Sequence, residues 1–272
     1  SEAVMLEVLN DTRNYCPADN YSLIFGSHGS SWLPAKKTSR ALGDDYGYAI
    51  NIPNLADVLS KSSMYFDFIL MDLCMMSTVE VAYELRNTAD YLVMSPTEII
   101  SYGFPYVDIM SLLFQRENKE KALIQVAQKF INYYDQASDR WGTMAVVKTS
   151  EMNGLAAEVS SIMEKCTENS KFNSSGLQQY GRSDFNNAIF DFEAFIRRLT
   201  KDNIPASFSQ QLNKAVVYKD FVDSKLGTLK IDENSYSGLG CYILNASPYT
   251  NWNSYYKQLQ WYKAAGINKA TW

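Results

Sequence analysis

The sequence predicts an α/β fold, a three-layer α/β/α sandwich around a mostly parallel central sheet. Short apolar runs of strand length recur along the chain, at 21–27, 66–73, 90–96 and 142–149. Segments whose apolar residues have helical spacing separate these runs, and this alternation is typical of a parallel sheet with helices on both faces. The chain has 272 residues, 46% of them hydrophobic, which is enough to bury such a core.

The N-terminal elements are a helix, a strand and a long loop. Residues 2–15 have apolar side chains near helical spacing, and the Cys16-Pro17 pair ends that helix. After the strand at 21–27, residues 33–49 are rich in charge and glycine, so we expect a mobile surface loop there.

The middle of the chain alternates helices with strands. Pro53 predicts the start of a short helix that leads back to the strand at 66–73. From residue 75 to residue 87 the apolar spacing is helical, so we expect a helix that begins directly at the end of this strand. An aromatic loop at 99–106 follows the third strand. Helices are then expected at 107–116 and 118–135, before the fourth strand.

The composition changes near residue 167, where a polar, turn-rich stretch begins. We therefore expect two parts, a core at 1–166 and a C-terminal elaboration at 167–272 that completes or flanks it. The remaining elements expected are a helix at 150–166, helical segments at 188–199 and 207–218 with a strand-like end, a glycine-framed strand at 237–244 and a closing helix at 253–266.

Composition and motifs exclude several classes of protein. The net charge is −5 and the basic residues are scattered, which argues against a nucleic-acid partner. No run reaches the roughly 18 apolar residues of a membrane span, and residues 1–16 lack the layout of a signal peptide. The chain has no P-loop, no dinucleotide-binding glycine motif and no G-x-S-x-G nucleophile elbow.

The four cysteines, Cys16, Cys74, Cys166 and Cys241, are far apart and form no C-x-x-C pair. This spacing argues against a disulfide framework or a cysteine-rich zinc site. With one histidine in the chain, a histidine-based zinc site would need carboxylate partners that the sequence does not identify. We therefore predict no cofactor and no metal.

The only histidine, His28, follows the strand at 21–27, and Cys74 follows the strand at 66–73. The carboxyl ends of parallel strands meet at one edge of a sheet, so we expect the imidazole and the thiol to lie together. An imidazole can hold a thiol as thiolate, the form that attacks an acyl carbon. The sequence therefore predicts a cysteine hydrolase.

Two local features would assist this chemistry. Gly29 has no β-carbon, so its amide can approach a substrate carbonyl and form an oxyanion hole with the amide of Cys74. The expected helix after Cys74 would place a positive dipole end beside the sulfur and lower the pKa of the thiol.

Each of these residues also has a structural interpretation. A lone histidine is more often a hydrogen-bonded structural residue than a catalytic one, and a cysteine at the end of a strand is more often a buried residue that packs in the core. Asp72 fits equally well as the N-cap of the expected helix. The aromatic residues of the loop at 99–106 fit either hydrophobic anchors or a substrate wall.

Longer motifs around these residues resemble a known family. His28 lies in S-H-G-S-x-W, and Asp72-x-Cys74 leads into VEVAYEL-x-x-x-ADYLV-x-S. Together with GFPY at 103–106 and SGLGCYILN near the end, these motifs resemble the clostripain family of cysteine peptidases. This family belongs to the caspase-like clan, with gingipains, legumains and caspases. The resemblance covers almost the whole chain.

The resemblance implies a caspase-like fold and specific roles. His28 matches the family's catalytic histidine, Cys74 its nucleophile, and Asp72 the acidic residue that selects arginine or lysine before the scissile bond. The loop at 33–49 lies where family members are cut during activation, which makes its basic residues possible processing sites. These residues are Lys36, Lys37 and Arg40. The family also implies protein or peptide substrates and a secreted, periplasmic or cell-surface bacterial location, with any signal or anchor upstream of Ser1.

Two departures from the family pattern leave an alternative open. Tyr102 stands where an aspartate is expected to help bind the basic side chain, so substrate binding by Asp72 and Tyr102 is expected to differ in detail. The family's first sheet strand precedes anything like residues 1–16, so an upstream segment or a separate chain is expected to complete the sheet. The leading hypothesis is an endopeptidase that works through an acyl-enzyme, and the alternative is a catalytically inactive binding or scaffold protein. Some relatives use calcium, for which the sequence shows no recognisable loop.

Overall fold

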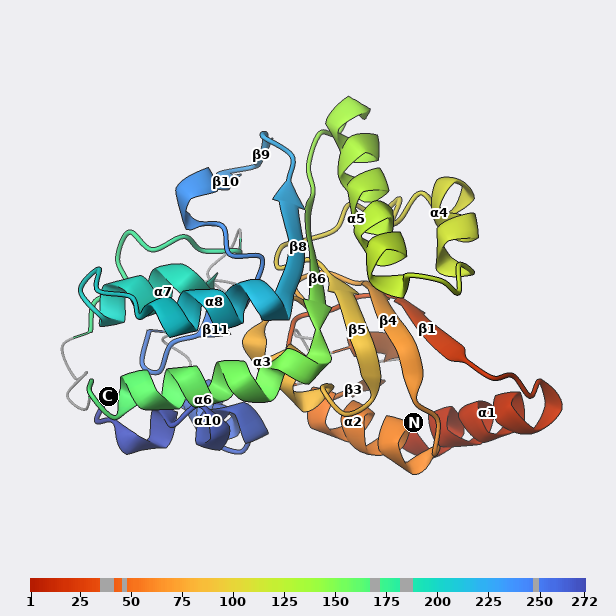
Figure 1. Ribbon diagram of the computed structural model, residues 1–272, viewed down its shortest axis with the longest axis horizontal. Helices are drawn as coiled ribbons and strands as arrows, with labels where there is room; N and C mark the ends of the chain where they lie inside the picture. Colours follow the sequence, from red (N-terminus) through yellow and green to blue (C-terminus); the bar gives the residue numbers. More distant parts are fainter. Residues whose placement is uncertain (35–41, 46–47, 167–171, 182–187, 247–249) are drawn as a thin grey trace.

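The computed structural model describes residues 1–34, 42–45, 48–166, 172–181, 188–246 and 250–272. Its centre is a five-stranded sheet with strand order β1-β4-β5-β6-β8 (Figure 1). The strands are β1 (Tyr21–Gly26), β4 (Phe66–Asp72), β5 (Ala89–Met94), β6 (Thr143–Lys148) and β8 (Val216–Phe221). Strands β1, β4 and β5 are parallel, and β6 is antiparallel to both of its neighbours, which returns β8 to the direction of the first three. The predicted mostly parallel sheet is confirmed.

Alternate residues of the buried strands pack into two separate hydrophobic cores. On β4, Ile69 and Met71 join the core beneath one set of helices, whereas Phe68 and Leu70 join the core beneath the other set. The first set is α1 (Glu2–Tyr15), α2 (Ile52–Lys61), α3 (Val79–Glu84) and α6 (Met152–Met163). The second set is α4 (Tyr106–Leu113) and α5 (Lys119–Gln136). Helices on both faces explain why these strands are continuous apolar runs in the sequence.

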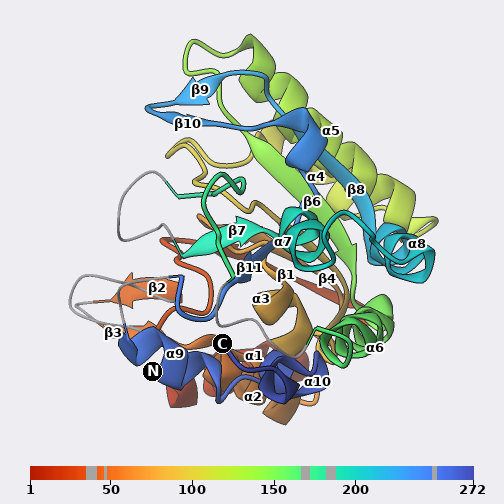
Figure 2. The ribbon, with the colours of Figure 1, turned by 90° about the vertical axis from the view of Figure 1, so that its left-hand side faces the viewer.

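The C-terminal third adds one strand to the central sheet and a second small sheet beside it. Strand β8 pairs with β6, and β7 (Ile189–Asp191) pairs antiparallel with β11 (Gly240–Tyr242), as Figure 2 shows. The other elements here are α7 (Phe192–Leu199), α8 (Ala206–Ala215), β9 (Lys225–Leu226), β10 (Leu229–Lys230), α9 (Thr250–Tyr256) and α10 (Gln260–Ala264). Short 3₁₀ helices occur at Thr149–Glu151, Glu233–Ser235 and Ile267–Lys269.

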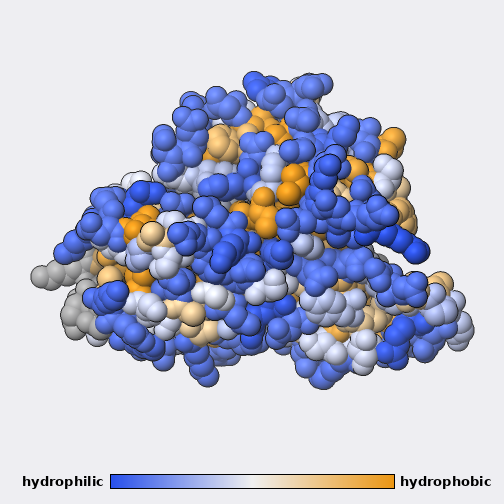
Figure 3. Space-filling view, in the orientation of Figure 1, coloured by the Kyte–Doolittle hydropathy of each residue, from blue (hydrophilic) through white to orange (hydrophobic). Residues whose placement is uncertain are grey.

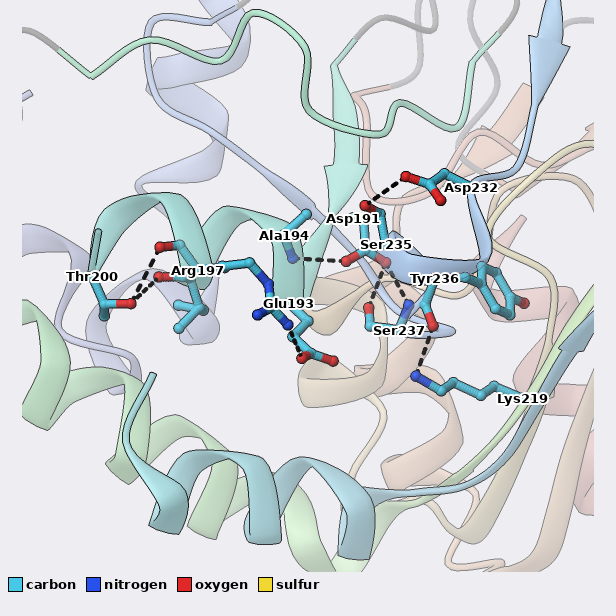
Figure 4. Close-up of polar contacts among 11 residues, drawn as sticks. Asp191, Glu193, Ala194, Arg197, Thr200, Lys219, Asp232, Ser235, Tyr236 and Ser237 are labelled. Atoms are coloured by element: carbon cyan, nitrogen blue, oxygen red, sulfur yellow. Dashed lines mark hydrogen bonds and ion pairs between the residues drawn. The ribbon is translucent and has the colours of Figure 1, made fainter. Parts of the chain in front are cut away.

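A buried carboxylate, Asp191, fixes this second sheet (Figure 4). Its Oδ1 accepts the amide of Ala194 at 2.8 Å and so caps α7, while its Oδ2 accepts the amide and hydroxyl of Ser237 at 2.7 and 2.6 Å. The hydroxyl of Tyr180 also donates to Oδ2, at 2.5 Å. A buried carboxylate is tolerated only when its oxygens are hydrogen-bonded, and these donors meet that need. Asp191 therefore ties the segment that enters β11 to the start of α7.

Four sequence expectations need correction. The helix expected from residue 75 begins at Val79, and the described part of the loop at 33–49 contains the strand β2 (Leu42–Asp45), which pairs antiparallel with β3 (Tyr48–Ile50). The expected helix at 188–199 starts with β7, because Ile189 pairs with Tyr242 across the second sheet. The closing helix is divided into α9 and α10, which are separated near Leu259.

Strand β1 forms one edge of the central sheet, and no strand among the described residues pairs with its outer side. Ser22 and Ile24 are exposed on the face that α4 and α5 cover elsewhere. A further strand here, from an upstream segment or a separate chain, stays a prediction. Intact-mass analysis of the natural product checks it, and a fully active chain beginning at Ser1 with no accompanying peptide would contradict it.

The face in Figure 3 is mostly hydrophilic, with apolar side chains gathered in small separate groups. No helix in the described ranges is both long and apolar enough to cross a bilayer.

Candidate active site

His28 and Cys74 lie at the same edge of the sheet. Gly26 at the end of β1 is paired with Asp72 at the end of β4, and the amide of Ser27 donates to the Asp72 carbonyl at 3.4 Å. His28 and Cys74 each follow two residues beyond this pair, and both line a pocket of about 400 Å³. The prediction that parallel strands bring the imidazole and the thiol to one edge is confirmed.

The thiol of Cys74 is half-buried against the loop that follows β5. The amide of Ile99 donates to Sγ at 3.4 Å, and the thiol contacts the Ile99 carbonyl at 3.7 Å. The loop itself is fixed by buried hydroxyls, because both Ser95 and Thr97 lie 2.7 Å from the hydroxyl of Thr143 on β6. This cluster of three hydroxyls was not predicted from the sequence.

A turn separates Cys74 from the next helix. Met75 has a left-handed backbone with φ of 63°, and its amide donates to the Thr97 carbonyl at 2.8 Å. Helix α3 begins only at Val79, where the hydroxyl of Thr78 accepts the amide of Val81 at 3.4 Å. The expected helix N-terminus beside the sulfur and the capping role of Asp72 are therefore both wrong.

Gly29 lies directly against the backbone that carries the thiol. A β-carbon at this position would come within 2.7 Å of the Cys74 carbonyl oxygen and 2.9 Å of the Met76 sulfur. Real side chains do not tolerate such contacts, so only glycine lets the histidine segment pack this closely. The two residues predicted to form an oxyanion hole are thus neighbours.

Asp72 points into the same pocket and receives two hydrogen bonds from the aromatic loop. Its Oδ2 accepts the amide of Phe104 at 3.1 Å and the hydroxyl of Tyr106 at 3.0 Å. Gly103, with φ of +67°, passes so close that any β-carbon would overlap the carboxylate. Burial raises the pKa of Asp72, and the two hydrogen bonds oppose this shift. Tyr102 lines the mouth of the pocket with 71% of its surface exposed.

A buried polar chain links the histidine segment to the C-terminal strand. The hydroxyls of Ser31 and Thr78 lie 2.9 Å apart, and Glu80, two residues further on, accepts the Tyr242 amide at 2.8 Å. The carbonyl of Ser77 accepts the amide of Gly240 at 2.8 Å, and its hydroxyl donates to Gly238 at 2.7 Å. Strand β11 therefore holds the turn after Cys74. Glu80 was not predicted from the sequence, and the signal that could have found it is an acidic residue inside the otherwise apolar VEVAY run.

The family comparison agrees with this geometry. A family model described as the clostripain family matches residues 1–272. The chain belongs to the clostripain family of cysteine peptidases. No curated protein matches this clostripain-family peptidase significantly.

Several solved structures resemble the peptidase. A secreted C11 cysteine protease from Bacteroides thetaiotaomicron, in complex with an irreversible peptide inhibitor, is 28% identical with a TM-score of 0.83, covering 99% of this chain and 78% of that chain. An inactive zymogen C11 protease from Parabacteroides distasonis is 35% identical with a TM-score of 0.81, and the match covers 97% of this chain and 75% of that chain. A Bacteroides thetaiotaomicron clostripain with the peptide inhibitor BTN-VLTK-AOMK is 28% identical with a TM-score of 0.72, and the match covers 82% of this chain and 97% of that chain. The caspase-like α/β fold is therefore shown.

The buried carboxyl of Glu80 predicts a pH dependence of the peptidase's stability. Burial raises its pKa from 4.5 to about 8, against the lowering effect of the Tyr242 amide. The folded protein therefore keeps a proton on Glu80 up to about pH 8, whereas the unfolded chain loses this proton above pH 4.5. This difference makes the free energy of unfolding fall as the pH rises from about 4.5 to about 8, by up to about 1.4 kcal/mol per pH unit. Urea unfolding from pH 5 to pH 9 should show a shallower fall of stability in Glu80→Gln than in the wild type, because the other buried carboxyls with raised pKa remain. Glu7→Gln, an exposed change on α1, is the control, and a full slope in Glu80→Gln would refute the assignment.

Lys36, Lys37 and Arg40 lie outside the described residues. A larger pocket of about 540 Å³ lies at the amino ends of β1 and β4 and is lined by neither the thiol nor the imidazole. Within the described ranges no three or more of His, Cys, Asp and Glu gather as metal ligands would.

Proposed function

We propose that this clostripain-family peptidase cleaves proteins through an acyl-enzyme on Cys74, with His28 as its proton carrier. The observation that carries the proposal is the shared pocket, in which the chain's single imidazole and a half-buried thiol meet at the ends of adjacent parallel strands. The family and the neighbours' names as cysteine proteases support it.

The reaction takes two displacement steps. The Cys74 thiolate attacks the carbonyl carbon of the scissile bond, and the amides of Gly29 and Cys74 receive the oxygen as it becomes negative. The tetrahedral intermediate expels the amine, which takes a proton from His28, and leaves a thioester. Water then attacks the thioester while His28 accepts its proton, which releases the acid and restores the Cys74 thiolate beside a protonated His28.

Asp72 gives the pocket a preference for lysine or arginine on the acyl side of the cleaved bond. A carboxylate held by an amide and a phenol hydroxyl in a half-buried pocket keeps its position and can pair with an ammonium or guanidinium group. The exposed ring of Tyr102 at the mouth offers the cation an aromatic face in place of a second acid.

A covalent probe separates the peptidase from an inactive scaffold. A peptidyl-lysine acyloxymethyl ketone should label Cys74 alone, and His28→Ala should slow the labelling without unfolding the protein. Peptide mapping by mass spectrometry identifies the modified cysteine, with exposed Cys16 as the internal control. Folded wild-type protein that stays unlabelled would favour the scaffold.

We also infer processing of the chain at the basic residues Lys36, Lys37 and Arg40. They follow the histidine segment closely in sequence, and one structural neighbour is described as an inactive zymogen. Replacing all three with alanine should leave a single chain on a denaturing gel, and so should Cys74→Ala if the cut is made by the peptidase itself. Unchanged fragments in either variant would assign the cut to another enzyme.

The site of action is proposed to be outside the cytoplasm of a bacterium. Two of the neighbours are described as secreted proteases of Bacteroides thetaiotaomicron. Immunodetection in fractionated cells and medium tests this, and retention in the cytoplasmic fraction alone would contradict it.

A further inference from the structure

We propose that the peptidase has a second specificity pocket, next to the Cys74 pocket, which binds a basic side chain of the substrate further along the acyl side. This inference rests on the proposed function and extends it. The second pocket has a volume of about 450 Å³ and is lined by Tyr102, Tyr133, Tyr134 and residues 136–139.

The two pockets share a wall. Tyr102 lines both of them, and the hydroxyl of Tyr134 donates to the carbonyl of Gly103 at 2.8 Å. Gly103 in turn packs against the Asp72 carboxylate. A substrate side chain in the second pocket would therefore be separated by the ring of Tyr102 from the substrate side chain that Asp72 binds.

The chemistry of the second pocket favours a cation. Tyr133 and Tyr102 are exposed by 44% and 71%, so ring surface is available to a passing ammonium or guanidinium group. The α5 helix ends at this pocket, and the carbonyl groups of a helix C-terminus attract positive charge.

The formal charges point the same way. Asp135 is paired with Arg140, whereas no ion pair among the described residues includes Asp139, the charged residue of the pocket lining, so the pocket carries a net negative charge. A lysine or arginine of the substrate would neutralise it. A neutral or acidic side chain would not.

The strand order sets the direction of the substrate. His28 follows β1, on one side of Cys74, and the leaving amine must lie near His28 to take its proton. The acyl part of the substrate therefore extends the other way, past β5 toward β6. The C-terminal end of helix α5 lies at the β6 and β8 side of the sheet, and in Figure 1 it extends beyond the tip of β8. The second pocket thus lies on the acyl side.

A positional peptide library tests the proposal, with cleavage rates measured for each residue at each acyl-side position. The wild type should prefer lysine or arginine at one position besides the one next to the cleaved bond. Asp139→Asn should reduce that second preference up to about fivefold, the size expected for an exposed charge pair. Tyr133→Leu should reduce it about two- to fivefold through loss of the ring face. Both variants should keep the preference next to the cleaved bond.

Asp11→Asn, an exposed change on α1, is the matched control and should leave both preferences unchanged. The second pocket is refuted if the wild type has no basic preference beyond the first position, or if Asp139→Asn leaves that preference intact. In those cases cleavage next to a basic residue persists and the proposed function stands. A wild type that cleaves no peptide in the library overturns both proposals.

Discussion

Replacing Cys74 with alanine is expected to lower kcat/KM for peptide cleavage by about 10⁴-fold or more, because the variant has no atom that can form the thioester. Replacing His28 with alanine is expected to cost about 10²–10⁴-fold, through loss of the proton carrier. A fluorogenic peptide with arginine before the cleaved bond provides the measurement. Both changes lie at a surface pocket, so circular dichroism should show an unchanged fold.

Cys16→Ala is the matched control, since Cys16 is the exposed cysteine at the end of α1. It should cleave the peptide at the wild-type rate. A Cys74→Ala variant with more than a few per cent of wild-type activity would remove Cys74 from the mechanism and direct attention to another nucleophile.

Asp72→Asn should lower kcat/KM for substrates with lysine or arginine before the cleaved bond by about 10²-fold, because the bound cation then faces a neutral amide in a half-buried pocket. The asparagine oxygen can still accept the Phe104 amide and the Tyr106 hydroxyl, so the loop should keep its position. Substrates with a neutral residue there should change little.

The pH profile gives a second readout of the same residue. Burial raises the pKa of Asp72, so its carboxylate should take up a proton at a higher pH than an ordinary aspartate. On acidification the wild type should lose its basic preference at a higher pH than that at which an ordinary aspartate takes up a proton, and Asp72→Asn should lack this step. A wild-type preference for apolar or acidic residues would show that Asp72 serves the aromatic loop alone.

The sheet and the meeting of His28 with Cys74 could be predicted because their signals are local. An apolar run that stops at a polar tip marks the end of a buried strand, and parallel strands bring such tips to one edge. The start of α3 could not be predicted from spacing. Met75 and Met76 are buried as helix residues would be, but they occupy a turn whose left-handed residue is Met75. The spacing of apolar residues indicates which side chains are buried, but it does not indicate the backbone angle φ of any residue.

The partners of the site could not be predicted because they are distant in sequence. Asp72 binds a loop more than thirty residues later, with Phe104 at a separation of 32 and Tyr106 at 34. Nothing around Asp72 distinguishes this use from a helix cap, since an aspartate before a helical pattern fits both. The charge of Glu80 within an apolar run could have signalled a buried partner, but nothing in the sequence identifies Tyr242 as that partner.

The attachment of β11 to the turn after Cys74 also has a consequence for the order in which the site forms during synthesis. The hydrogen bonds Ser77–Gly238 and Glu80–Tyr242 join residues 161 and 162 positions apart. The ribosome makes the imidazole and the thiol well before residues 238–242. Contacts of such long range form only after the intervening chain is available. A nascent or truncated chain that stops before residue 238 thus carries the nucleophile on a turn without this support, so we expect proteolysis only once residues 238–242 are made.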